Sequence, residues 1–332
     1  MDIRNIRSLK DNAAHVLRIG REPKTVVLWY SGITVLIAAV LTVCSYWLSM
    51  QISSTGGLRN LGTRAIFSTA QSLLPIVQSV ALMCLELGYL HAMMRITRKQ
   101  YADHTDLKAG LPRLGAMIRL NLIQAFFYAM IAIPSLGLSI QIFLLTPWSD
   151  GFLDIVLPLA ESTTVLNPEI VMDEATLAQA TEAMIPMMIL YFVLYMLFLI
   201  PVTYRFRMAN YALLDAPHSG AFAAIGASMK MTRRNCIALF KLDLSFWWYY
   251  LPSFLLGFVS YGDVILPMVG ITLPMNETVS YFLFYGLYLA GLFAMTYFLR
   301  NKVECTYISA YETICEKPKD SGVVLGNIFD MQ

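Results

Sequence analysis

The feature that most constrains this chain is a succession of six long apolar segments, separated by polar stretches in which the basic residues are unevenly placed. The hydrocarbon core of a bilayer is about 30 Å thick, so a helix needs roughly 20 mostly apolar residues to cross it. Segments 26–50, 73–94, 120–145, 184–204, 237–261 and 279–299 meet that requirement. We therefore predict an all-α, polytopic transmembrane helical bundle with about six spans.

The overall composition agrees with a lipid environment. Hydrophobic residues make up 57% of the chain and charged residues only 14%. A soluble domain has about 45–50% apolar and about 25% charged residues. A chain this apolar lacks the polar surface that water requires, so the lipid bilayer is its predicted partner.

The basic residues orient the predicted spans. All 24 lysines and arginines except Arg59 and Arg64 fall before span one, between spans two and three, around the loop between four and five, or after span six. The predicted outer loop, 146–183, contains no basic residue. By the positive-inside rule both termini are cytoplasmic, and an odd number of spans would destroy this separation. We thus expect a cytoplasmic amphipathic segment (1–24), a membrane domain (25–304) and a cytoplasmic helix and tail (305–332).

Each predicted cytoplasmic segment carries apolar residues three or four apart with basic neighbours, a pattern typical of helices in the headgroup layer. The apolar positions lie between Ile3 and Ile19, at Leu107, Leu111, Leu114 and Ile118, and at Phe222, Ile225 and Met229. We expect these helices to contact anionic lipid. One interfacial helix plus two spans would then occur three times as a repeat. The alternative is that any membrane protein with basic inner loops shows the same pattern.

Polar residues inside the second span form the first candidate site. Ser72, Ser79 and Glu86 are spaced by sevens, which keeps them on one helical face, and Gln78 lies alongside. An ionised carboxylate at this depth costs several kcal/mol unless it is paired or hydrated. Glu86 is therefore either part of a substrate or proton site, or a protonated side chain that bonds a neighbouring helix.

A second candidate site is a charge cluster at the inner side. Asp243 lies at a depth comparable to that of Arg205, Arg207 and Arg300, so we expect it to pair with one of them. The pair would be structural, or it would form a cytoplasmic-side gate or ligand contact. In span six, Gly286, Ala290 and Ala294 form a ladder of small residues, which predicts close helix packing within the bundle or across a homodimer.

The second half of the chain contains a distinctive series of short motifs. These are YRFRMANYALLDAP after the fourth span, SMKMTRRNCIALFKLDLSFWW leading into the fifth, and TYISAYETI after the sixth. In these motifs the chain resembles the bacterial membrane family, mainly of Firmicutes, that is known as domain of unknown function 975. The resemblance is specific over 204–248, although Met231 stands where the family has glycine. It implies a helical protein of the bacterial plasma membrane and implies no particular activity.

No motif for phosphate binding, metalloprotease, serine hydrolase or paired-cysteine chemistry occurs, and the four histidines are scattered. We therefore predict no enzyme, cofactor, metal site, disulfide framework or nucleic-acid partner, and give intramembrane catalysis the least weight. Two classes remain. The first is transport, by a permease or by the membrane partner of an exporter whose ATPase is a separate chain. The second is a membrane-organising or regulatory protein that binds lipid or another membrane protein.

Overall fold

The computed structural model describes residues 5–19, 22–54, 61–155, 174–216, 218, 220–268 and 274–316. Within these ranges every regular element is a helix, which confirms the predicted all-α class for the part described. The chain divides into two compact units. Unit 1 comprises Met1–Leu120 and Arg207–Gln332, and unit 2 comprises Asn121–Phe206.

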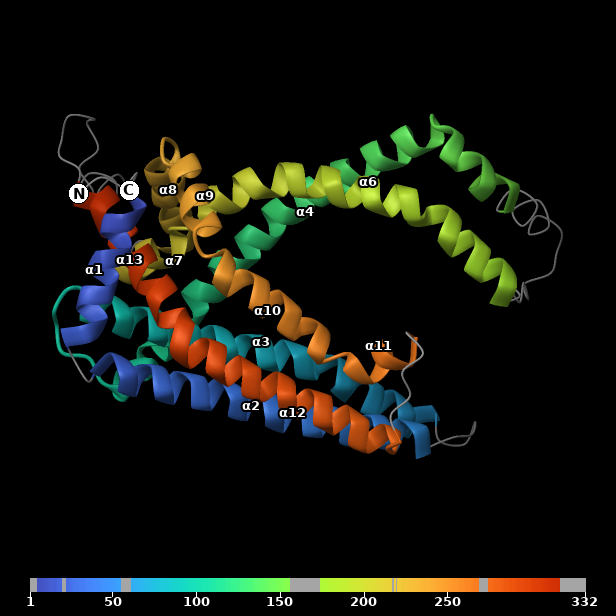
Figure 1. Ribbon diagram of the computed structural model, residues 1–332, viewed down its shortest axis with the longest axis horizontal. Coiled ribbons are helices and arrows are strands. Elements are labelled where there is room, and N and C mark those ends of the chain that lie inside the picture. The colour runs from blue at the N-terminus through green and yellow to red at the C-terminus, as the bar shows by residue number, and fades with distance from the viewer. Residues whose placement is uncertain are drawn as a thin grey trace. The chain divides into compact units, whose positions relative to one another are not determined.

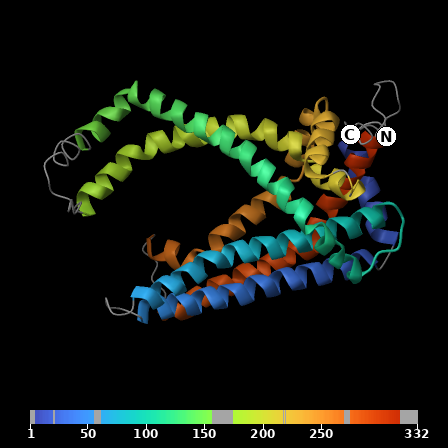
Figure 2. The same cartoon turned by 180° about the vertical axis from the view of Figure 1, so that it is seen from behind.

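Unit 1 is built on three long helices that lie side by side (Figures 1 and 2). They are α2 (Glu22–Ser54), α3 (Leu61–Thr97), and a continuous helix made of α12 (Glu277–Met295), the π-helical η4 (Thr296–Arg300) and α13 (Asn301–Glu316). The shorter elements are α1 (Ile6–Ile19), the 3₁₀ helix η2 (His104–Arg113), the start of α4 (Leu114–Leu144), α7 (Ala209–Asp215), α8 (Gly220–Thr232), α9 (Cys236–Leu244), α10 (Trp247–Val259) and α11 (Gly262–Met268).

Unit 2 contains the rest of α4, the short η3 (Pro147–Ser149) and α6 (Glu174–Phe206). The ring of Phe206, at the end of α6, lies 5.3 Å from that of Phe127 on α4. Helix α6 begins at Glu174, about ten residues before the predicted fourth span, so the predicted outer loop is shorter than 146–183. Residues 156–173 of that loop lie outside the described residues.

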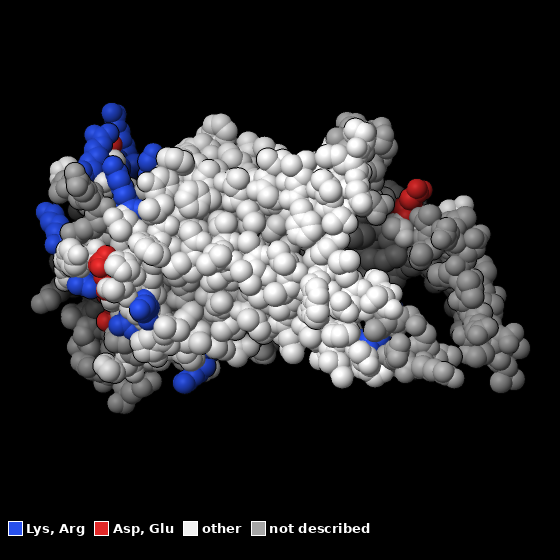
Figure 3. Space-filling view, turned by 90° about the horizontal axis from the view of Figure 1, so that it is seen from below, with Lys and Arg blue, Asp and Glu red and all other residues white. Residues whose placement is uncertain are grey.

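Five helices in the described residues are long and apolar enough to cross a membrane, as expected for a multi-pass membrane protein. They are Pro23–Ser54, Gly62–Thr97, His104–Leu144, Gln179–Asp215 and Thr278–Cys315. Large apolar side chains are exposed along them, for example Leu36 on α2, Ile133 on α4 and Leu197 on α6. In Figure 3 most of the visible Lys and Arg side chains gather at the left, and most of the rest of the visible surface is uncharged. We call the end of unit 1 formed by α1 and by the ends of α3 and α13 the basic end.

The predicted fifth span, 237–261, is not one continuous helix. Helix α9 ends at Leu244 and α10 begins at Trp247, and the chain changes direction between them (Figure 1). The backbone N–H of Ser245 bonds back to Lys241 and Leu242, which closes α9. The predicted segment 237–261 thus comprises two helices, and the apolar sequence between them contains neither proline nor glycine to mark the break.

All three predicted interfacial helices pack against protein along part of their surface. On α1, which contacts α13, the side chains of Leu9 and Ala13 are fully buried. The second predicted helix is η2, which packs on α3 and buries Leu107. In the third, α8, Ile225 is buried while Phe222 stays exposed.

Glycine makes the contact between α3 and η2 possible. A Cβ atom at Gly88 would lie 1.9 Å from the carbonyl oxygen of Leu107, and one at Gly110 would lie 2.0 Å from that of Cys84. Real Cβ atoms do not approach backbone oxygen so closely, so no side chain fits at either position. The two backbones therefore touch where the chain leaves α3 and folds back on it.

Candidate functional site: polar clusters along α12–α13

Arg300 occupies a special position, at the end of the π-helical turn that joins α12 to α13. Such turns widen the helix by one residue and are frequent at functional sites. Arg300 Nη2 lies 2.7 Å from Glu86 Oε1 on α3, and Arg300 Nε lies 3.9 Å from Glu304 Oε1. The side chain of Glu86 is 40% exposed, whereas that of Arg300 is only 20% exposed.

Two tyrosine rings flank the same guanidinium. Its central carbon lies 5.1 Å from the ring centroid of Tyr30 on α2 and 5.7 Å from that of Tyr89 on α3. The two rings stack on each other at 4.3 Å, and both are buried. A planar, delocalised cation suits such a setting better than an ammonium group. Arg300 therefore ties α2, α3 and α13 together.

A second cluster surrounds Asp243, directly before the break between α9 and α10. Its Oδ1 accepts hydrogen bonds from the hydroxyls of Tyr250, at 2.6 Å, and of Tyr307. The Nη2 of Arg207 lies 3.7 Å from the same oxygen, and its guanidinium carbon lies 4.2 Å from the ring centroid of Tyr307. The Tyr250–Asp243 bond links the two helices across the break.

A third cluster centres on Arg98, just after α3. It bonds Asp215 through Nη1 and Nη2, at 2.7 and 2.9 Å, and Glu312 through Nε at 2.9 Å. The bond to Asp215 raises the pKa of Arg98 further above its ordinary value. Tyr311 donates to Asp215 as well, at 2.8 Å. Tyr211, one turn before Asp215 on α7, donates to Glu304 at 3.0 Å, so α7 and α13 share a polar interface.

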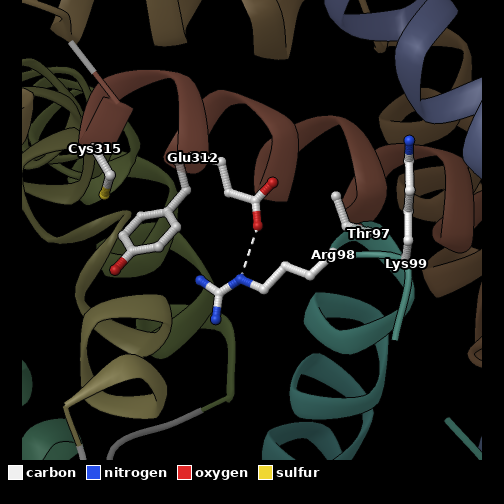
Figure 4. Close-up of a pocket in the computed structure, with 6 residues that line it drawn as sticks. Thr97, Arg98, Lys99, Glu312 and Cys315 are labelled. Atoms are coloured by element: carbon white, nitrogen blue, oxygen red, sulfur yellow. Dashed lines mark hydrogen bonds and ion pairs between the residues drawn. The ribbon is translucent and has the colours of Figure 1, made fainter. Parts of the chain in front are cut away.

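An open pocket of about 450 Å³ lies at the third cluster. It is lined by Thr97, Arg98, Lys99, Tyr311, Glu312 and Cys315. Figure 4 shows Glu312 reaching the guanidinium of Arg98, while the side chain of Lys99 points away from both. Lys99 has φ 59°, in the left-handed region that usually takes glycine.

The predicted site residues separate into different places. Ser72 and Ser79 donate to carbonyls of their own helix, those of Thr69 and Pro75, whereas Glu86 pairs with Arg300. Gln78 is half-buried on the same helix, α3. In the predicted inner charge cluster, Asp243 has Arg207 as its neighbour, while Arg300 pairs with Glu86 and Arg205 belongs to unit 2. In the small-residue ladder Gly286 and Ala290 are exposed and Ala294 is half-buried.

The tyrosines and the acids on α13 were not among the residues predicted from the sequence. Glu304, Tyr307 and Tyr311 follow Arg300 at spacings of three and four, which places them on one helical face. That periodic polar stripe, directly after an apolar span, was the available signal. Among the described residues no group of three or more His, Cys, Asp and Glu could hold a metal ion, and the five cysteines are free.

No protein-family model matches the chain, and neither the curated proteins nor the solved structures contain a match.

Proposed function

We propose that the chain is a transport protein of the bacterial plasma membrane, either a permease or the membrane partner of an exporter whose ATPase is a separate chain. The observation that carries this proposal is the break between α9 and α10 next to the Asp243–Arg207 cluster. Discontinuous helices are common in transporters, where freed backbone groups and helix ends bind substrate or coupling ions. Irregular backbone at membrane depth is tolerated where protein or a water-filled cavity surrounds it.

The course of the chain supports six crossings. Met231 on α8 lies 3.8 Å, sulfur to sulfur, from Cys315 near the end of α13. Thr278, at the start of α12, accepts a hydrogen bond from Tyr46 in the last third of α2. Helices α9 and α10 lie in the chain between these two points, and we therefore count them together as a sixth crossing in this proposal. Helix α1 and the end of α13 then lie on the side of the basic end, which the positive-inside rule assigns to the cytoplasm.

The Glu86–Arg300 pair gives the transport proposal its second support. It sits at a π-helical turn, where a change of one residue in register would move Arg300 away from Glu86. An ion pair that joins two long helices is an element that can exist in two arrangements, closed and open. In this proposal the pair breaks when the bundle opens toward the cytoplasm.

The test uses Glu86→Gln, with Ser79→Ala as the matched control on the same helix. Membrane vesicles with the basic end outward, prepared from cells that express each variant, are incubated in a metabolite extract. The solutes retained inside are then identified by mass spectrometry. A solute that accumulates with the unaltered chain and with Ser79→Ala, but not with Glu86→Gln, supports transport. Identical contents in all vesicles, including vesicles without the chain, contradict it.

A non-transporting, membrane-organising protein is the second candidate, favoured by the gathering of Lys and Arg at one end (Figure 3). Such a surface suits anionic lipid. The exposed Gly286 and Ala290 would suit a homodimer contact. Purification in native lipid followed by mass spectrometry separates the two candidates. A stoichiometric ATPase supports the exporter form of the first candidate, and enriched anionic lipid without an ATPase or a transported solute supports the second.

A further inference from the structure

The break between α9 and α10 is in contact with a residue more than 230 positions away. Lys10 of α1 donates a hydrogen bond of 2.9 Å from Nζ to the carbonyl oxygen of Ser245. The same Nζ lies 4.4 Å from the ring centroid of Phe246. An ammonium group is therefore held by a backbone carbonyl and an aromatic face, the two kinds of neutral group that recognise cations.

The position is electrostatically suited to a cation. Ser245 is the C-cap of α9, and the C-terminal end of a helix carries partial negative charge on its free carbonyls. Phe246 is only 2% exposed, so its ring forms a fixed wall. In discontinuous membrane helices the C-terminal ends of half-helices coordinate cations in this way.

The way Lys10 is held differs from that of the three arginines in the clusters described above. Arg98, Arg207 and Arg300 each have a carboxylate within 4.0 Å. In the described part of the chain Lys10 forms no such ion pair. Burial lowers the pKa of Lys10, a cost that a carboxylate partner would have offset. Contacts with neutral groups alone are weaker, which suits a cation that leaves the site.

We propose that the carbonyl of Ser245 and the ring of Phe246 form a binding site for a primary ammonium group, which Lys10 fills in the conformation described here. Helix α1 then acts as an internal ligand. Its apolar face, with Leu9 and Ala13 buried, positions Lys10, and a free primary amine takes the same place when α1 moves away. The assignment of primary amines as substrate class rests on the proposed transport function, whereas the binding site itself does not.

The test is chemical rescue of Lys10→Ala, which removes three methylenes and the ammonium and leaves space for n-propylammonium. The thermal unfolding midpoint of the purified full chain is measured in detergent. We expect Lys10→Ala to lower the midpoint. We expect n-propylammonium, at several times its dissociation constant, to raise it again by about 1–2 °C, with no change in the unaltered chain. The isosteric neutral control, 1-propanol, should have no such effect.

A second variant guards against an unspecific response. Lys10→Ala combined with Phe246→Leu keeps an apolar side chain but lacks the aromatic face, and we expect at least half of the rescue to be lost. No rescue of Lys10→Ala, an equal effect of 1-propanol, or an equal shift in the unaltered chain would overturn the proposal. Rescue without any solute accumulation in vesicles would support the ammonium site and contradict the proposed transport function. Glu86-dependent accumulation without rescue would support transport and contradict the ammonium site.

Discussion

Glu86 and Arg300 lie 214 positions apart in the chain, yet their side chains form an ion pair of 2.7 Å between α3 and the π-helical turn before α13. Arg300 is the more enclosed partner and also faces Glu304, Tyr30 and Tyr89. The two ends of this pair should therefore respond differently to substitution.

We expect Arg300→Ala to lower the free energy of unfolding by roughly 3 kcal/mol, because it leaves two carboxylates without their cation. Glu86→Gln should cost less than about 1 kcal/mol, because its carboxylate is 40% exposed and Arg300 keeps Glu304. Denaturant unfolding of both variants in detergent micelles measures the difference. Equal losses would show that Arg300 is not the center of this cluster.

Gly88→Ala should be among the most damaging small substitutions in unit 1. Its new methyl group would meet the backbone of Leu107 at 1.9 Å and force η2 off α3, at a cost of about 3 kcal/mol or more. The matched control is Gly32→Ala on α2, where a Cβ meets nothing within 4 Å and helix propensity should make the change neutral or stabilising. If the two variants unfold at the same denaturant concentration, the result contradicts the close contact between α3 and η2.

The hydropathy of the chain was enough to place the long helices, because lipid imposes a length and a composition on any helix that crosses it. It could not place the break at Ser245 and Phe246, since the surrounding residues are as apolar as a continuous helix requires. The pairing of Arg300 with Glu86, and not with Asp243, was also not predicted; Arg300 lies at the end of a π-helical turn, where one extra residue shifts the side chains of the helix.

Lys99→Gly should stabilise the chain by about 0.5–1 kcal/mol. Lys99 ends α3 in a Schellman motif, in which its N–H bonds Ile96 and the N–H of Gln100 bonds Arg95. Its positive φ is costly for a residue with a Cβ atom and free for glycine. Lys99→Ala keeps the Cβ atom and should give no gain. If Lys99→Ala raises the free energy of unfolding as much as Lys99→Gly does, the effect comes from the lost charge and not from the positive φ.

Asp103 forms a capping box with Asp106 at the start of η2. We expect the stability that this cap contributes to depend on pH. Hydrogen bonds from His104 lower the pKa of Asp103 below its ordinary value. Its contribution to stability is therefore complete above the ordinary pKa of about 4 and is lost as the pH falls through the lowered value. The stability advantage over Asp103→Asn should shrink between about pH 5 and about pH 3 in thermal unfolding. A constant difference over that interval would contradict the role of the charge.

The central claim is tested most directly by determining the side of the membrane on which each end of the bundle lies. In a variant without native cysteines, a single cysteine is introduced as Asp150→Cys, after α4, or as Lys302→Cys, at the start of α13. Intact cells are treated with a membrane-impermeant thiol reagent. We predict labelling at position 150 in intact cells, and at position 302 only after permeabilisation. Labelling at 302 but not at 150 in intact cells, or the same response at both positions, would contradict the proposed topology.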